Sequence, residues 1–152
     1  MYHFFVRNMA RQVFERLNEG DYEALLKGFT LAPDFTHTFA GNHALGGIRH
    51  SEAGMRRWFE RLFRLFPGLN FEIKDILVKG WPWNTVVAVE WIDRATPKDG
   101  QPYVNEGVHV LRLRQGRLVE LHAYLDSQKV EAVCQRLAQQ GVSEAVAPPI
   151  ED

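Results

Sequence analysis

The sequence predicts a single α+β domain in which amphipathic helices cover a curved antiparallel sheet and enclose a pocket of small-molecule size. A length of 152 residues suits one domain with one sizeable core. Apolar residues recur at helical spacing near both ends of the chain, whereas period-two alternation dominates from about residue 69 to residue 125. These strand-like segments follow one another without intervening helices, which argues against a parallel βαβ sheet.

The composition excludes several classes of protein. Hydrophobic residues make up 45% and charged residues 24% of the chain, as in an ordinary globular protein. The formal net charge of -1 and the interleaved basic residues argue against binding to nucleic acid or to an anionic membrane. No run of about 18 apolar residues and no secretory leader is visible, so we expect a cytoplasmic protein. The single Cys134 is expected to be a buried small hydrophobe.

Three helices and a short strand are predicted before residue 69. The first two helices cover about residues 4–18 and 22–29, the second capped by Asp21. Period-two alternation predicts a strand at 34–39, with His37 between two phenylalanines on one face, and the glycines that follow predict a loop. Ser51 can cap a third helix, which places Trp58 on an apolar stripe and ends at the Pro67-Gly68 break.

Four strands and a closing helix are predicted after that break. A phase change near Lys74-Asp75 indicates a bulge, and the dense apolar run 85–93 favours a strand covered on both faces. Segments 103–114 and 117–125 form the clearest hairpin, with Gln115-Gly116 as a two-residue turn. Ser127 can cap a last helix. We expect one domain over residues 1–140 and a tail over 141–152.

A two-residue turn fixes the register of this hairpin, although a single bulge would shift it. The expected pairs are Arg114 with Arg117, Leu111 with Glu120, His109 with His122, Gly107 with Tyr124, and Asn105 with Asp126. One face then carries leucines near the turn and polar groups at the other end, as a ligand pocket does. The opposite face is apolar and predicts a homodimer through the sheet; its residues are Val108, Val110, Val119, Leu121, Ala123 and Leu125.

The chain resembles the SnoaL-like branch of the nuclear-transport-factor-2-like superfamily, which includes polyketide cyclases. The resemblance rests on segments 18–25, 34–37, 65–71 and 107–120 and on Tyr124-x-Asp126, and it spans nearly the whole chain. It implies a conical sheet wrapped by helices around a central cavity. It also implies that an acidic residue in the cavity acts as general acid and base without metal or cofactor. The superfamily contains isomerases, dehydratases, epoxide hydrolases and non-catalytic binding modules as well.

Cyclisation or isomerisation next to a carbonyl requires a base for a carbon-bound proton and a donor for the enolate oxygen. His122 or Asp126 is the expected base. The expected substrate-binding residues, among them the donors to the oxyanion, are His37, Trp58, Asn105, His109 and Tyr124. The carboxylate, tyrosine and protonated acid of ketosteroid isomerase have no convincing copy here. The ligand is expected to be a compact apolar molecule with a carbonyl.

Structural interpretations of the same residues remain open. His109 and His122 would also form a cross-strand polar pair, and Asp126 would also cap the last helix. No metal-ligand spacing is present, so no metal or cofactor is expected, although a site from His37, His109 and His122 is geometrically conceivable. The competing function is a non-catalytic ligand-binding or dimerisation module of the same fold.

Overall fold

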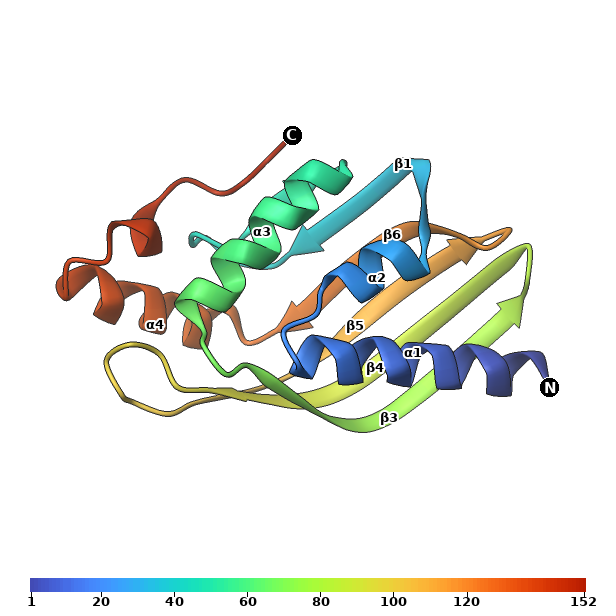
Figure 1. The fold of residues 1–152 in the computed structure, drawn as a ribbon, viewed down its shortest axis with the longest axis horizontal. Helices are drawn as coiled ribbons and strands as arrows, with labels where there is room; N and C mark the ends of the chain where they lie inside the picture. Colours follow the sequence, from blue (N-terminus) through green and yellow to red (C-terminus); the bar gives the residue numbers. More distant parts are fainter.

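A computed structural model describes all 152 residues and confirms the α+β class. Six strands form one curved sheet in the order β2-β1-β6-β5-β4-β3, accompanied by four α-helices and a 3-10 helix (Figure 1). The elements are α1 (Tyr2–Asn18), α2 (Glu23–Gly28), β1 (Thr30–Phe39), β2 (Gly47–Arg49), α3 (Glu52–Leu65), β3 (Asn70–Trp81), β4 (Asn84–Ala95), β5 (Tyr103–Arg114), β6 (Arg117–Leu125), α4 (Ser127–Gln139) and η1 (Ser143–Val146).

Helices α1, α2 and α3 lie across one face of the sheet, which we call the inner face, and the opposite face is the outer face (Figure 1). Helix α4 and η1 lie together beyond one end of the sheet. All neighbouring strands are antiparallel except β1 and β6, which are parallel. The expectation of a wholly antiparallel sheet is therefore wrong at this one pair. None of the helices has the length and apolarity required to cross a bilayer.

Side-chain caps begin three of the helices. The Ser51 hydroxyl accepts a hydrogen bond from the Gly54 amide at 3.0 Å, as predicted, and Asp21 accepts one from Ala24 at 3.3 Å. At α4 the cap is Asp126, whose carboxylate accepts from the Gln128 amide at 3.1 Å. The expected cap Ser127 is instead the first helical residue.

Besides an irregularity between Leu31 and Thr36 of β1, the sheet has bulges in β3 and β6 that affect which side chains face inward. The first lies in β3 between Ile73 and Asp75, where the sequence predicts it. The second lies in β6 at Val119, because Leu113 pairs with Leu118 whereas Arg112 pairs with Glu120. The turn itself has the predicted two residues, with φ of 53° at Gln115 and 76° at Gly116.

The bulge at Val119 reverses the predicted faces of β6. Beyond it His122 pairs with Val110 and Tyr124 with Val108, so both lie on the outer face. Leu121 and Ala123 are buried on the inner face, the reverse of the prediction. The physical cause is that side chains alternate with period two, so one extra residue exchanges the two faces of everything that follows.

Strand β4 shows the same alternation. Its inner side chains, Val87, Val89, Trp91 and Asp93, are buried, whereas Val86, Ala88 and Ile92 on the outer face are only half-buried. In this single chain β4 is therefore covered on one face, not on both as expected. The region predicted as a loop after β1 contains the short strand β2, which pairs with the end of β1.

Candidate functional site

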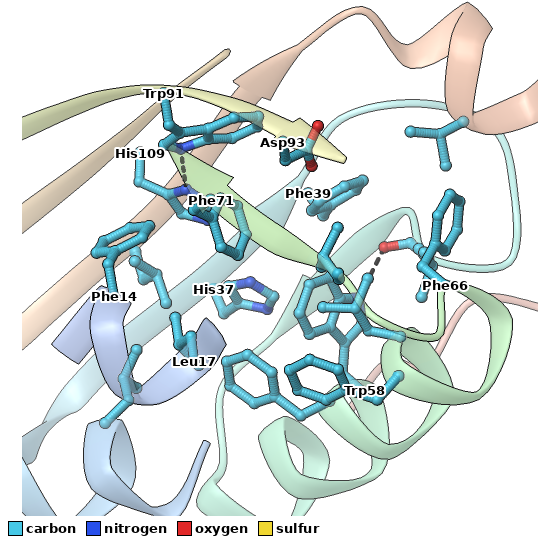
Figure 2. Close-up of a pocket in the computed structure, with 18 of the residues that line it drawn as sticks. Phe14, Leu17, His37, Phe39, Trp58, Phe66, Phe71, Trp91, Asp93 and His109 are labelled. Carbon is cyan, nitrogen blue, oxygen red and sulfur yellow. Dashed lines mark hydrogen bonds between the residues drawn. The ribbon is translucent and has the colours of Figure 1, made fainter. Parts of the chain in front are cut away.

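An apolar cavity lies between the inner face of the sheet and the helices (Figure 2). Seventeen of its 20 lining residues are hydrophobic, and the other three are His37, Asp93 and His109. The cavity has a volume of only about 30 Å³, which is enough for one or two waters. The three polar side chains come from β1, β4 and β5, so they stand on the rigid sheet rather than on loops.

Asp93 supplies the one carboxyl group of the cavity. The alternation of β4 turns it inward with Trp91, and only 5% of the residue is exposed. Its Oδ1 is buried without a hydrogen-bond partner. Burial raises the pKa of Asp93 to about 7, against the opposing effect of the Asp93 and Asn105 backbone amides. The group can therefore gain and lose a proton near neutral pH.

His37 provides a buried donor. The Arg49 Nε donates to its Nδ1 at 2.8 Å, and because Nδ1 accepts, the proton of the neutral ring is on Nε2. Nε2 is buried and has no partner. Burial holds the pKa of His37 well below its usual value, and the charge of Arg49 lowers it further. The ring packs edge-on against Trp58, with centroids 4.5 Å apart.

Arg49 of β2 is completely buried beside this histidine. Its two terminal nitrogens donate to the carbonyls of Gly46 at 2.9 Å, Ile150 at 2.8 Å and Gly47 at 3.1 Å. Burial lowers the pKa of Arg49 to about 10, so the guanidinium remains charged at neutral pH. The guanidinium carbon also lies 5.3 Å from the centre of the Trp58 ring, a cation-π distance.

His109 is the second buried histidine of the cavity. The Trp91 indole donates to its Nδ1 at 2.8 Å, the bond drawn in Figure 2. Phe14 and Phe71 pack edge-on against its ring. Burial, assisted by the nearby His122, lowers the pKa of His109 to about 4. Both cavity histidines are therefore neutral at physiological pH.

The fold and the sequence agree on a family. Residues 10–121, well over half of the chain, match the family model of the SnoaL-like domain. The chain belongs to the SnoaL-like family. A search of curated protein sequences finds no significant match.

Solved structures similar to this SnoaL-like chain share its fold. A nuclear-transport-factor-2-like protein of unknown function from Burkholderia pseudomallei is 20% identical, with a TM-score of 0.72 over 83% of this chain and 94% of that one. IdmH from Streptomyces antibioticus, a candidate polyketide cyclase, is 26% identical, with a TM-score of 0.62 over 89% and 97%. AclR from Streptomyces galilaeus, a candidate hydroxylase, is 22% identical, with a TM-score of 0.64 over 87% and 94%.

Three of the seven residues predicted for the site line the cavity of this SnoaL-like chain: His37, Trp58 and His109. The Trp58 indole N–H already has a partner within the protein, because it donates to the Leu45 carbonyl at 2.8 Å. Asn105 is buried but outside the cavity lining, and its amide donates to the Tyr103 hydroxyl at 3.0 Å and the Asp126 carbonyl at 2.9 Å. It ties β5 to the start of α4.

The remaining three predicted residues, Tyr124, His122 and Asp126, also lie outside the cavity. Tyr124 is 50% exposed on the outer face, where its ring stacks on His122 with centroids 3.9 Å apart. His122 Nδ1 lies 3.4 Å from the Glu120 carboxylate on that same face. Asp126 caps α4. The predicted pairing of His109 with His122 is wrong, because His109 faces Ala123.

Sequence reasoning missed Asp93 and Arg49. Asp93 was detectable, since it continues the inward alternation of Val87, Val89 and Trp91, but the segment was interpreted only as an apolar run. Arg49 gave no local signal, because its burial depends on residues about 100 positions away. No group of three or more His, Cys, Asp or Glu side chains is placed to hold a metal ion.

Proposed function

We propose that this chain is a cofactor-independent isomerase or cyclase that moves a proton next to a carbonyl of a compact, largely apolar molecule. The observation that carries the proposal is the pair of unsatisfied polar atoms in an apolar cavity, Asp93 Oδ1 and His37 Nε2. One is a proton acceptor with a pKa near neutrality, and the other is a fixed neutral donor.

The two groups account for a complete proton transfer. The Asp93 carboxylate removes the proton from the carbon next to the carbonyl, while the carbonyl oxygen accepts a hydrogen bond from His37 Nε2 and becomes an enolate oxygen. In an isomerisation, the Asp93 carboxylic acid returns the proton to another carbon. In a cyclisation, the enolate carbon attacks a second carbonyl of the same molecule, and the acid protonates the alkoxide formed. The charge of Arg49 beside Nδ1 strengthens the donor at Nε2.

The likeness to IdmH supports the cyclase branch of this proposal. That protein is described as a candidate polyketide cyclase and is 26% identical over 89% of this chain. Membership of the SnoaL-like family supports the same reaction class without a metal or cofactor. Asp93, rather than the expected His122 or Asp126, is the base that we propose, because it alone of the three lines the cavity.

Access to the cavity requires movement. Pockets for drug-sized ligands have volumes of about 300–1,000 Å³, far more than the roughly 30 Å³ open here. Every lining residue is buried except Phe63 of α3, which is half-exposed. We place the mouth of the cavity at Phe63. The second candidate function is a ligand-binding module without catalysis, which the largely hydrophobic lining of the cavity favours.

Exchange of α-protons tests the proposal without knowledge of the substrate. We would incubate 2-tetralone, a compact apolar ketone, with the protein in deuterium oxide and follow loss of the α-proton signals by NMR. We expect exchange at least about 100-fold above the buffer rate, the usual contribution of a positioned base. Asp93→Asn should abolish the acceleration and His37→Phe should reduce it. A chelator should leave the rate unchanged.

His122→Ala is the matched control, because it removes a histidine from the outer face of the same sheet. It should retain the wild-type exchange rate. Wild-type protein that exchanges no faster than Asp93→Asn would refute the enzyme proposal. Binding of 2-naphthol, an apolar phenol that imitates an enolate, without any such acceleration would establish the binding module instead.

We also propose a homodimer that covers the outer face. This face presents Val108, Val110 and Tyr124 on the central strands and the 61%-exposed Leu77 on β3. Apolar side chains gathered on one sheet face often mark a contact with another protein. Of the six apolar residues predicted for the outer face, Val108 and Val110 lie on it, whereas Leu121, Ala123 and Leu125 face the core instead.

A further inference from the structure

Residues 148–152, which follow η1, run along β2 and the start of α3. Three anchors hold them there. Arg61 donates to the Pro148 carbonyl at 2.8 Å, and Arg49 donates to the Ile150 carbonyl at 2.8 Å. The Asp152 carboxylate accepts from the His50 amide at 2.6 Å and from the Ser51 hydroxyl.

Two glycines make room for this segment. A Cβ atom on Gly47 would lie 2.7 Å from the Glu151 carboxylate and 3.1 Å from Pro149 Cβ. A Cβ atom on Gly54 would collide with the Asp152 carboxylate. Such separations are below ordinary van der Waals contact, so a larger residue at either position would require the side chains of residues 149–152 to move. The segment therefore packs closely against β2 and the start of α3.

The segment completes the surroundings of Arg49. The other acceptors of its guanidinium are Gly46, just before β2, Gly47, within β2, and His37, on the paired strand β1. The Ile150 carbonyl is the one acceptor from a distant part of the chain, 101 residues away. Without it, an N–H of a completely buried guanidinium would lose its partner, or water would have to enter.

We infer that residues 148–152 are positioning residues of the candidate site: by fixing Arg49 they hold His37 with its proton on Nε2, toward the cavity. The chain of contacts runs from the Ile150 carbonyl through the guanidinium to Nδ1 of the imidazole. A guanidinium only donates, so as long as it contacts Nδ1 that nitrogen must be the acceptor. The tautomer follows from this geometry alone, whereas its effect on catalysis rests on the proposed function.

The tautomer is directly measurable. Long-range ¹⁵N–¹H correlation spectra of labelled protein distinguish protonated from unprotonated ring nitrogens of His37. In the full chain we expect the proton on Nε2 alone and no titration of His37 between about pH 5 and pH 8, since its pKa lies well below the usual value. Deletion of residues 148–152 should admit water to Arg49, produce both tautomers and bring the titration of His37 into this range.

A full-length variant guards against loss of folding in the deletion. The double substitution Arg61→Gln with Asp152→Ala removes two of the three anchors, leaves Arg49 itself unchanged, and should act in the same direction as the deletion. Arg64→Gln is the control, because Arg64 pairs with Glu144 in η1 and does not contact the segment. If the double variant and, where it folds, the deletion keep the wild-type His37 signals, the inference is wrong.

The exchange assay separates this inference from the proposed function. If the tautomer changes in the variants but wild-type protein shows no α-proton exchange, the positioning contact stands and the enzyme proposal fails. If wild-type protein is active and the altered tautomer leaves kcat and its pH profile unchanged, the catalytic part of the inference fails. We expect kcat to fall and KM to change little, because the donor acts on the developing oxyanion.

Discussion

The pKa values of Asp93 and His109 shift in opposite directions in the same apolar cavity. Burial disfavours the charged form of each, so it raises the pKa of the acid to about 7 and lowers that of the histidine to about 4. Both groups are buried within one apolar cavity lining. The pair therefore makes opposing contributions to the pH dependence of folding between the two values.

The Asp93→Asn substitution should reveal the contribution of Asp93 to the pH dependence of stability. The folded-state pKa of Asp93 lies above its ordinary value of 3.8, so its contribution to stability is complete below that pH and is lost as the pH rises through about 7. The stability of the variant relative to wild type should therefore increase by on the order of 4 kcal/mol between about pH 4 and pH 8. Urea unfolding at a series of pH values measures the difference.

His109 changes the free energy of unfolding with pH in the opposite direction. Its folded-state pKa lies below the usual 6.5, so its contribution is complete above that pH and is lost as the pH falls toward 4. With the carboxyl removed, Asp93→Asn should therefore lose stability on acidification more steeply than wild type. A difference between the two proteins that stays constant with pH would contradict the raised pKa of Asp93.

Individual site residues were predictable wherever their element was regular. His37 and Trp58 were placed correctly by the alternation of β1 and the apolar stripe of α3. Asp93 obeys the same rule and could have been found by extending the alternation of β4. Arg49 could not have been found in this way, because a three-residue strand is too short to show an alternation. Its partner Ile150 is also distant in sequence.

At the scale of elements, α2 and α3 meet in a stack of aromatic rings at the mouth of the cavity. Tyr22, just before α2, lies parallel to Phe59 of α3 with centroids 5.3 Å apart, and Phe63 lies 6.3 Å from Tyr22. Phe59 is buried, whereas Tyr22 and Phe63 are half-exposed. Opening the cavity at this place breaks ring contacts but no backbone hydrogen bond of the sheet.

Phe63→Ala should therefore speed ligand entry. An aromatic pair contributes about 0.5–1.5 kcal/mol beyond burial, so its loss should raise the open population by roughly two- to tenfold. Stopped-flow fluorescence with 2-naphthol would report the association rate. Phe5→Ala is the control, since Phe5 is an exposed phenylalanine on α1 that does not line the cavity. Equal association rates in the two variants would place the mouth elsewhere.

The bulge in β6 is the element-scale feature that most affects the site. Val119 is the extra residue of the bulge, so its deletion should leave an unbroken ladder in which Leu121 and Ala123 stay inward and His122 and Tyr124 stay outward. We therefore expect the deletion to cost no more than about 1–2 kcal/mol, and Val119→Ala, which retains the bulge, to cost less than about 1 kcal/mol. Urea unfolding measures both. A loss of more than about 3 kcal/mol on deletion, as expected if Leu121 became exposed and His122 and Tyr124 were forced into the core, would contradict this register.

This bulge also explains the main error of sequence reasoning. The helices, the hairpin, its turn and the bulge of β3 were all predictable, because each has a local pattern of caps, glycines or a phase change. In β6 the segment Leu118-Val119-Glu120-Leu121 gives two acceptable alternations, since Val119 and Leu121 are both apolar. Only packing against the helices decides between them.

At the scale of the whole molecule, the uncovered outer face predicts self-association. Val110 lies opposite His122 near the middle of that face. Val110→Arg should place a charge in the proposed interface and weaken the dimer by at least about 2 kcal/mol, roughly thirtyfold in Kd. Light scattering across a concentration series measures this. Leu121→Arg is unsuitable, because Leu121 belongs to the core and its substitution would unfold the chain.

Phe5→Arg is a matched control for the dimer, since it charges an exposed apolar residue on α1, across the sheet from the outer face. It should leave the dimer intact. Wild-type protein that remains monomeric at micromolar concentration would contradict the proposed assembly. Purification of Val110→Arg as a folded dimer would contradict the proposed interface.

The parallel pairing of β1 with β6 has a consequence for synthesis on the ribosome. Thr30 lies beside Arg117 and Phe39 beside Ala123, so the edge of β1 that faces β6 has no partner until residues 117–123 have emerged. Chains are made at about 5–20 residues per second, so that edge stays unpaired for several seconds. The cavity wall formed by His37 thus closes only after β6 has been made, and a chaperone can bind the open edge until then.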